Sequence, residues 1–338
     1  MSATRIATAT LGTHGPRTGI QGLGCMGMSF AYGPTDATEA RATLERALEL
    51  GVTLFDTADM YGAGANETFL SPFFLAHRDE VVVASKFGIV LDPSDPVKRG
   101  IRNDRAYLRS CIEGSLRRLG LDVIDLYYMH RRDPQVPIED TVGAMAELVA
   151  EGKVRHLGLS EVTGAELRAA HAVHPIAAVQ SEWSLFSRDV ERSAVPAAGE
   201  LGVAFVPYSP LGRGFLTGSF TDAGAELTAE DFRRRQPRFN GANAVVNAEQ
   251  LARVRAVAEA RGATTGQIAL AWVHQQAAVH GLTVVPIPGT RRRARLEENT
   301  AASRITLTAQ ELAALEPIAA AVAGDRYPDM TFTSAARE

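Results

Sequence analysis

Cysteine is scarce in this sequence, and long apolar runs are missing. The 338 residues include only two cysteines, Cys25 and Cys111, far apart in the chain and without other thiols near them. Neither a disulfide framework nor a metal site is therefore expected. No window approaches the roughly 18 consecutive apolar residues of a membrane-spanning helix, and the first ten residues lack a signal-peptide core. We expect a cytoplasmic protein that does not enter a membrane.

An excess of charge of one sign is also missing. The formal net charge is −4, with 22% charged and 46% hydrophobic residues. This composition supports a large core and gives no general attraction to nucleic acid or to anionic membranes. The basic residues are nearly all arginine, because the only lysines are Lys86, Lys98 and Lys153. Because lysine is so rare here, the lysine inside a strand-like run, Lys86, is a candidate functional residue.

Short β-branched or aromatic runs alternate with amphipathic segments along the whole chain. The predicted strands are residues 22–29, 52–56, 81–85, 123–129, 154–159, 177–180, 203–206 and 283–285. The predicted helices are residues 38–50, a segment from about 66, 104–119, 138–151, 163–173, 189–200, 247–261, 264–279 and 291–302. Eight strands interleaved with helices predict an α/β fold, a single (β/α)8 TIM barrel over residues 1–338.

The ends and loops complete this prediction. The N-terminal 20 residues are expected to form a short β-hairpin that caps the bottom of the barrel. Long loops, residues 87–103 and 208–246, are expected at the end where the strands finish. A doubly wound open sheet is the alternative fold for the same alternation of strands and helices.

A glycine motif near the N-terminus resembles a dinucleotide fingerprint. Residues 22–27 (GLGCMG) fit G-x-G-x-x-G. The fingerprint functions only where the glycines open a helix whose N-terminus meets the pyrophosphate, and here the first helix begins at about Thr38. We interpret the glycines as a strand with close backbone contacts beside a cofactor at the barrel mouth, and not as a Rossmann domain.

Three polar residues stand at the ends of three successive predicted strands. Asp56, Lys86 and His130 end or directly follow their apolar runs, and Tyr61 lies five residues after Asp56 in the next loop. The carboxyl ends of barrel strands meet at one mouth, so these four side chains are expected to lie together. Each of them alone has an ordinary structural interpretation: a cap, an edge-of-core lysine, a packed histidine and a loop aromatic.

This set of groups suits carbonyl reduction. A phenol has an ordinary pKa of about 10, and a neighbouring ammonium is expected to lower it by about 2–3 units. The carboxylate keeps that ammonium charged and aimed, and the histidine orients the substrate oxygen. Such a phenol can protonate an oxygen that becomes negative as a hydride reaches its carbon.

The motifs resemble those of the aldo-keto reductase superfamily. The similar segments, in order along residues 20–300, are 56–62 (DTADMYG), 85–88 (SKFG), 125–130 (DLYYMH), 158–160 (GLS), 180–185 (QSEWSL), 208–214 (YSPLGRG) and 287–290 (IPGT). The resemblance implies a (β/α)8 barrel that reduces aldehydes and ketones with NADPH. It also implies that Tyr61 is the general acid, that Lys86 and Asp56 tune it, and that His130 orients the substrate.

The same resemblance implies a groove for NADP(H). It assigns the nicotinamide to Tyr208 by stacking and to Ser160 and Gln180 by hydrogen bonds. The remaining residues that it implies are Ser209, Leu211 and Gly212 for the diphosphate, Gly289, Thr290, Arg292 and Arg295 around the 2′-phosphate, and Glu298 and Asn299 for adenine. The chain departs from the family pattern at Glu161, where many relatives have asparagine, and at Gly289, where other branches have lysine.

Several alternatives stay open at this stage. The partner is expected to be a small carbonyl substrate, and both a monomer and a homo-oligomer are compatible with the sequence. A dinucleotide-binding regulatory subunit, similar to the potassium-channel β subunits of this fold, is the alternative function. The arginines of residues 291–295 could instead form a solvated helix face. The aromatic and apolar residues Phe30, Tyr32, Met60, Phe87 and Trp183 line either a substrate pocket or the core.

Overall fold

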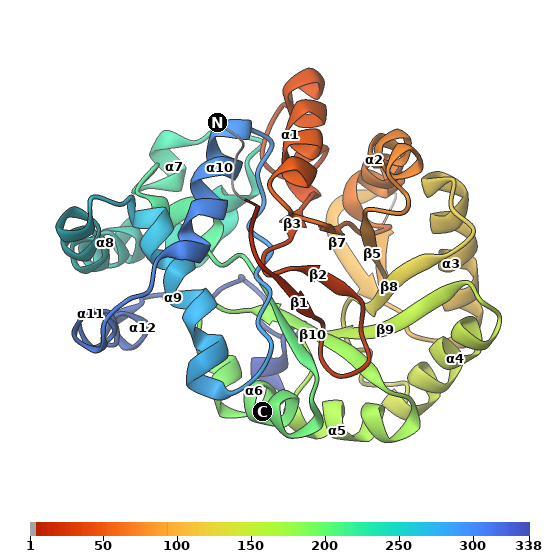
Figure 1. Ribbon diagram of the computed structural model, residues 1–338. Coiled ribbons are helices and arrows are strands. Elements are labelled where there is room, and N and C mark those ends of the chain that lie inside the picture. Colours follow the sequence, from red (N-terminus) through yellow and green to blue (C-terminus); the bar gives the residue numbers. More distant parts are fainter. Residues whose placement is uncertain (1–4, 93) are drawn as a thin grey trace.

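A parallel sheet that curves almost into a closed barrel forms the centre of the molecule (Figure 1). The computed structural model describes residues 5–92 and 94–338, without the side chains of 95–98. The strands follow one another around the sheet as β3 (Leu23–Gly24), β4 (Leu54–Asp56), β5 (Val82–Phe87), β8 (Ile124–Met129), β9 (Val154–Ser160), β10 (Ile176–Glu182) and β11 (Ala204–Tyr208). Their order follows the sequence, as expected for a barrel.

An irregular extended segment, residues 283–289, takes the eighth position. It bridges β11 at Phe205–Val284 and β3 at Gly24–Gly289, and the Gly22 amide donates to the Pro286 carbonyl at 2.9 Å. Proline has no N–H group, so Pro286 and Pro288 interrupt a regular ladder. The predicted strand 283–285 therefore lies in the predicted place but consists only of isolated bridges. The predicted barrel fold is confirmed.

Helices surround this sheet and cover its outer face (Figure 1). They are α1 (Ala37–Glu49), α2 (Ala65–Ala76), α3 (Arg105–Leu119), α4 (Ile138–Ala150), α5 (Gly164–Val173), α6 (Ala194–Leu201), α8 (Gly241–Arg261), α9 (Thr265–His280) and α10 (Arg293–Ala301), followed by α11 (Ala309–Leu315) and α12 (Ile318–Ala321). Local chemistry fixes several of their starts. Thr163 and Thr264 each form a reciprocal capping box with the residue three positions on. None of the helices in the described residues is long and apolar enough to cross a membrane.

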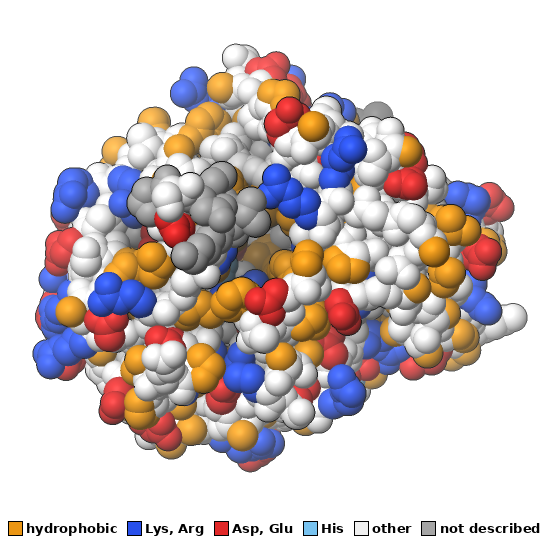
Figure 2. Space-filling view, turned by 180° about the vertical axis from the view of Figure 1, so that it is seen from behind, with side chains coloured by type: hydrophobic (Ala, Val, Ile, Leu, Met, Phe, Trp, Pro, Cys, Tyr) orange, Lys and Arg blue, Asp and Glu red, His pale blue; other side chains and the backbone are white. Residues whose placement is uncertain are grey.

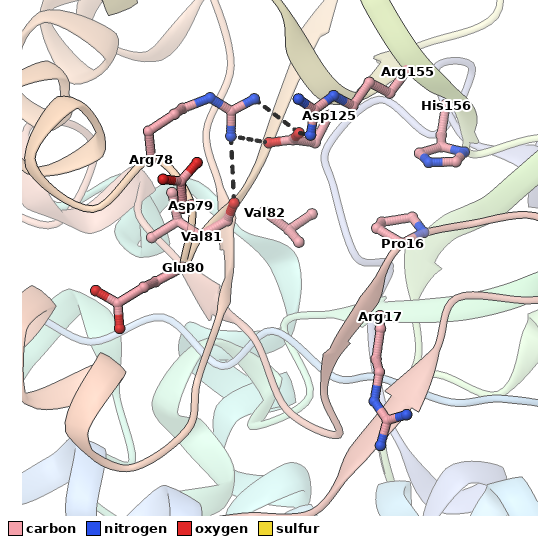
Figure 3. Close-up of a pocket in the computed structure, with 10 residues that line it drawn as sticks. All are labelled: Pro16, Arg17, Arg78, Asp79, Glu80, Val81, Val82, Asp125, Arg155 and His156. Carbon is pink, nitrogen blue, oxygen red and sulfur yellow. Dashed lines mark hydrogen bonds and ion pairs between the residues drawn. The ribbon is translucent and has the colours of Figure 1, made fainter.

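The predicted N-terminal hairpin is present as β1 (Thr8–Thr10) and β2 (Arg17–Gly19). The hairpin contacts residues just before two barrel strands. The Gly19 amide donates to the Thr53 hydroxyl, before β4, and the Thr13 hydroxyl donates to the Gly202 carbonyl, before β11. The hairpin thus caps the amino ends of the strands. A cavity of about 280 Å³ lies beside the hairpin (Figure 3). In its lining, Asp125 accepts hydrogen bonds from Arg78 and forms an ion pair with Arg155. This end is opposite to the carboxyl ends, where the predicted site lies.

Several elements differ from the prediction. The predicted loop 87–103 contains an antiparallel hairpin, β6 (Ile89–Asp92) and β7 (Asp95–Ile101). The predicted strand 22–29 is only two residues long and continues as a 3₁₀ turn, Met26–Met28. The predicted helix 189–200 is divided into a 3₁₀ turn, Asp189–Arg192, and α6. Within the predicted loop 208–246 lie α7 (Ala223–Glu226), short 3₁₀ turns and the first turn of α8.

Candidate active site at the carboxyl ends of the strands

Neighbouring strand ends bring the four predicted catalytic side chains together. Asp56 is the last residue of β4, Lys86 lies near the end of β5, His130 follows β8, and Tyr61 opens the 3₁₀ turn after β4. The Lys86 ammonium forms an ion pair with Asp56 and lies 3.5 Å from the Tyr61 hydroxyl. The Tyr61 and His130 rings meet edge to face with centroids 5.9 Å apart. Each of the four side chains is buried.

Two further hydrogen bonds hold the Asp56 carboxylate and the Lys86 ammonium in place. The Lys86 ammonium also donates to the Thr57 carbonyl at 2.8 Å. The amide Nε2 of Gln180 donates to the second oxygen of Asp56 at 2.8 Å. Both carboxylate oxygens of Asp56 are thus engaged, which keeps the lysine aimed at the phenol. Gln180, which the resemblance assigns to the nicotinamide, uses its amide N–H on Asp56 in this structure.

Burial controls the protonation of this group of residues. The pKa of Tyr61 is raised well above its ordinary value by burial, then by the charge of Asp56, and Arg131 opposes both effects. Burial also lowers the pKa of Lys86, against the pull of Asp56. The sequence predicts the opposite direction for the Tyr61 pKa, because the neighbouring lysine can be read from it and the extent of burial cannot. The phenol consequently keeps its proton and remains available as a donor.

His130 is a neutral residue at the same place. Burial lowers the pKa of its imidazole well below the ordinary value, and the charges of Arg131 and Lys86 add to this effect. Its Nδ1 atom is buried and has no hydrogen-bond partner among the residues that the structure describes. Since buried polar atoms are nearly always paired, a neutral imidazole with a free nitrogen is suited to meet a bound polar group.

An apolar wall surrounds the phenol. Ala58 and Met60 pack with Tyr61, and Met26, Phe30, Ile89 and Leu91 complete this cluster. The hairpin β6–β7 supplies Ile89 and Leu91, so the element that the sequence did not predict contributes to the site. The face shown in Figure 2, opposite to the hairpin cap, is hollowed near its centre and bordered there by hydrophobic side chains.

The other apolar candidates have different places. Trp183 is packed against Phe205 and Trp272 in the core. Phe87 is fully buried and stacks on Tyr127. Both are core residues, and of the five predicted pocket residues only Phe30 and Met60 lie in the cluster around Tyr61.

The predicted nicotinamide residues lie next to this group. Ser160 ends β9 and pairs in register with Gln180 of β10, while Tyr208 ends β11. The Tyr208 hydroxyl donates to Glu161 at 2.7 Å, and part of its side chain remains exposed. An anchored aromatic ring of this kind offers a flat face for stacking.

The loop after β11 has an unusual backbone. Ser209, Gly212, Arg213 and Gly214 all have positive φ, between 50° and 94°. Ser209 and Arg213 are not glycines, so this conformation is costly for them and must be stabilised by the surrounding structure. Hydrogen bonds within the turn hold this conformation, since the Gly212 amide donates to the Ser209 carbonyl at 2.9 Å and the Gly214 amide to the Leu211 carbonyl at 3.0 Å.

Residues from three separate segments meet at the predicted adenosine end. Gly266 of α9 lies close to Leu211, in the loop after β11, and to Glu298 of α10. A Cβ atom added to Gly266 would be 3.8 Å from the Leu211 side chain and 3.5 Å from the Glu298 carboxylate. Arg292 and Arg295 are exposed at the start of α10, and no carboxylate lies within ion-pair distance of either among the described residues. Asn299 is buried on the same helix, and the Thr290 hydroxyl accepts from the Arg292 amide at 3.2 Å.

The neighbouring arginines have structural partners instead. Arg291 donates to the carbonyls of Gly27, Tyr32 and Gly33 and so holds the loop after β3. Arg293 pairs with Glu39 of α1 at 2.9 Å. The arginines of residues 291–295 are therefore not a uniform solvated helix face: two hold protein groups, and two are free to bind a ligand.

Glu161 connects the rim of the barrel to the end of the chain. Its buried carboxylate forms a bidentate ion pair with Arg326 at 3.0 and 3.1 Å, and it accepts from the Ser334 amide as well as from Tyr208. Burial raises its pKa, but Arg326 and Arg131 outweigh this effect and lower the pKa to about 2. The sequence marked Glu161 only as a departure from the family pattern, and it offered no signal for Arg326.

The described residues contain no cluster of three or more histidine, cysteine, aspartate or glutamate side chains that could hold a metal ion. The candidate site consists of the phenol, its lysine and carboxylate, the neutral imidazole and the adjacent residues Ser160, Gln180 and Tyr208. The arrangement can donate a proton to a carbonyl oxygen beside a bound ring system.

Comparisons with known proteins agree with this description. The model of the Aldo/keto reductase family matches residues 22–320. A solved glycerol dehydrogenase, AKR11B4 from Gluconobacter oxydans, is similar with a TM-score of 0.79 and 26% identity, over 97% of this chain and 99% of that one. A thermostable aldo-keto reductase, Tm1743, solved with the inhibitor epalrestat, has a TM-score of 0.70 and 27% identity over 93% and 100% of the two chains. The aldo-keto reductase AKR11C1 from Bacillus halodurans, at 24% identity over 96% and 100% of the chains and a TM-score of 0.73, shares the fold.

Proposed function

The chain belongs to the aldo/keto reductase family, a family of carbonyl oxidoreductases, and from this premise we propose that it reduces aldehydes or ketones to alcohols with NADPH. The observation that carries the proposal is the convergence of Tyr61, Lys86, Asp56 and His130, with the Lys86 ammonium 3.5 Å from the Tyr61 hydroxyl. A bound reduced nicotinamide would supply a hydride to the carbonyl carbon.

The residues of the chain account for the other half of the reaction. Tyr61 keeps its proton because burial raises its pKa, and it donates this proton to the carbonyl oxygen as negative charge develops there. Lys86 stabilises the phenolate that is left, since an ammonium beside it lowers the energy of the charged form. Neutral His130, whose ring meets that of Tyr61 edge to face, holds the same oxygen in place. Solvent returns the proton to Tyr61 after the product leaves.

Several residues beside the candidate site support the proposal of a dinucleotide with a 2′-phosphate. Tyr208 presents a ring whose hydroxyl is anchored by Glu161, and Ser160 lies on the neighbouring strand end. The glycine-containing loop of residues 209–214 follows Tyr208 directly, which supports the diphosphate position that the resemblance implies. Arg292 and Arg295 provide two guanidinium groups without carboxylate partners among the described residues, and such forks suit a phosphate.

The experiment that tests this function is a turnover assay with the purified protein. NADPH and an activated aromatic aldehyde should give stoichiometric oxidation of the dinucleotide and formation of the alcohol. Tight dinucleotide binding without turnover on a panel of aldehydes, ketones and sugars would instead favour a regulatory subunit.

Charge reversal of Arg295 is expected to weaken NADPH binding selectively. Arg295→Glu places a carboxylate beside the 2′-phosphate, so the dissociation constant for NADPH should rise by at least about tenfold while that for NADH changes little. Fluorescence titration with both dinucleotides measures the two constants. Arg293→Glu, at an arginine already paired with Glu39, is the matched control. Equal constants for NADPH and NADH in the unmodified protein would refute the cofactor preference.

A further inference from the structure

Arg131, the residue after His130, is a cation at the mouth of the barrel with only uncharged partners. Its Nη1 donates to the His130 carbonyl at 2.8 Å and to the Ser160 hydroxyl at 3.3 Å. Its Nη2 lies 3.5 Å from the hydroxyl of Tyr327. The guanidinium is thus fixed on one edge, while the edge toward Tyr327 makes a single long contact.

The other arginines of this rim are neutralised by carboxylates. Arg213 pairs with Glu182 at 3.0 Å, and Arg326 pairs with Glu161 at 3.0 Å. No carboxylate among the described residues lies within 4.0 Å of the Arg131 guanidinium. Arg213 and Arg326 are buried, but Arg131 keeps part of its surface exposed. Arg131 is therefore an accessible positive charge at the mouth without a carboxylate in contact among the described residues.

This charge lies within electrostatic reach of the reacting groups. Arg131 opposes the rise that burial and Asp56 cause in the pKa of Tyr61, and it adds to the lowering that burial causes for His130. The mechanism proposed above gives it no task. The charge of Glu161 acts favourably on Arg131, but that carboxylate is in direct contact with Arg326 and not with Arg131. A guanidinium fork that touches no carboxylate can take one from a ligand, and it fits a carboxylate better than any single acceptor.

We propose that Arg131 binds a carboxylate of the substrate, so that the preferred substrates are aldehydes or ketones carrying a carboxylate near the reacting carbonyl. The Tyr327 hydroxyl, which accepts from the guanidinium at 3.5 Å and lies 3.3 Å from the Tyr208 hydroxyl, borders the same place. The proposal rests on the carbonyl reductase function and specifies its substrate class. The competing role for Arg131 is a contact with the cofactor, because it also touches Ser160.

The test compares two substrates that differ only in charge, 4-carboxybenzaldehyde and methyl 4-formylbenzoate, with NADPH. The unmodified protein is expected to have a kcat/KM about 10- to 100-fold higher for the carboxylate, which is the range of a hydrogen bond to a charged group. Arg131→Gln should abolish this preference, so that the ratio of the two kcat/KM values falls toward one. Because the substitution also removes a positive charge that acts on Tyr61, this ratio is the readout and not either value alone. Arg131→Lys, which keeps the charge and loses the fork, should retain part of it.

The controls separate the possible outcomes. Arg105→Gln removes a positive charge from the exposed surface of α3, where Arg105 pairs with Glu147, and should leave the preference intact. A preference that persists in Arg131→Gln, or a variant that changes only the KM for NADPH, overturns the proposal. Equal turnover of both aldehydes by the unmodified protein also overturns it while the reductase function stands. Turnover of neither overturns both.

One measurement does not depend on whether the Arg131 variants fold. In the unmodified protein, benzoate should inhibit reduction of the neutral ester competitively and about tenfold more strongly than benzamide, which has a similar shape without the charge. Equal inhibition by the two compounds contradicts a carboxylate subsite.

Discussion

Replacing Tyr61 by phenylalanine is expected to lower the rate of carbonyl reduction by about 10²- to 10⁴-fold, the usual contribution of a positioned general acid. The phenol is the group whose hydroxyl lies 3.5 Å from the Lys86 ammonium, and phenylalanine keeps its packing with Met60 and Phe30 while removing that hydroxyl. Initial rates at saturating NADPH and aldehyde measure the loss in kcat. The dissociation constant of NADPH should stay close to its original value.

The matched control for this substitution is Tyr127→Phe. Tyr127 is equally buried, stacks on Phe87, and its hydroxyl has no partner among the described residues. Its loss should leave kcat unchanged. Full turnover by the Tyr61→Phe variant would remove Tyr61 as the proton donor and with it the proposed mechanism.

The sequence was sufficient to predict that the four proposed catalytic side chains lie together, because the order of the strands carries that information. Asp56, Lys86 and His130 end consecutive parallel strands, and the sheet order β4, β5, β8 places these ends side by side. The direction in which the pKa of Tyr61 shifts could not be derived from strand order. That pKa depends on how much water the cluster of Met26, Phe30 and Met60 excludes, and exclusion of water is a property of the packed structure.

The hairpin β6–β7 illustrates a second limit. The strand Asp95–Ile101 contains Pro96 and Gly100, two residue types that are depleted in strands, so its sequence favours a loop. Pairing such as Ile89 with Ile101 and Val90 with Gly100 forms the hairpin despite this propensity. Local preference was overridden by tertiary contacts, and two of the residues beside Tyr61 were missed as a result.

Glu161 shows why a departure from a family pattern can be recognised without being explained. The residue has a φ of +52°, a left-handed conformation that asparagine tolerates better than glutamate. Asparagine, expected there from the resemblance, would satisfy the backbone. Glutamate is strained at this position, and its ion pair with Arg326, which lies 165 residues later, compensates for the strain. No local sequence pattern could reveal that partner.

Removing the charge of Glu161 is expected to destabilise the protein by about 3–5 kcal/mol, because it leaves Arg326 as a buried cation without its main partner. At an unfolding entropy of about 2 cal/mol/K per residue, this lowers Tm by roughly 4–7 °C. Calorimetry of Glu161→Gln measures the change. The same substitution should weaken NADPH binding, since Tyr208 loses the carboxylate that accepts its hydroxyl at 2.7 Å.

The acid stability of the protein gives an independent test of the same ion pair. Because the native carboxylate has its pKa lowered to about 2, against an ordinary value of 4.5, its stabilising effect is complete above pH 4.5 and is lost as the pH falls toward 2. The difference in unfolding free energy between the unmodified protein and Glu161→Gln should therefore shrink across this window. Glu200→Gln is the matched control: its carboxylate pairs with Arg168 at 2.7 Å on the exposed surface, where water screens the pair and its contribution to stability is small. If the two substitutions change the unfolding free energy equally, the charge of Glu161 does not hold Arg326 and Tyr208 in place.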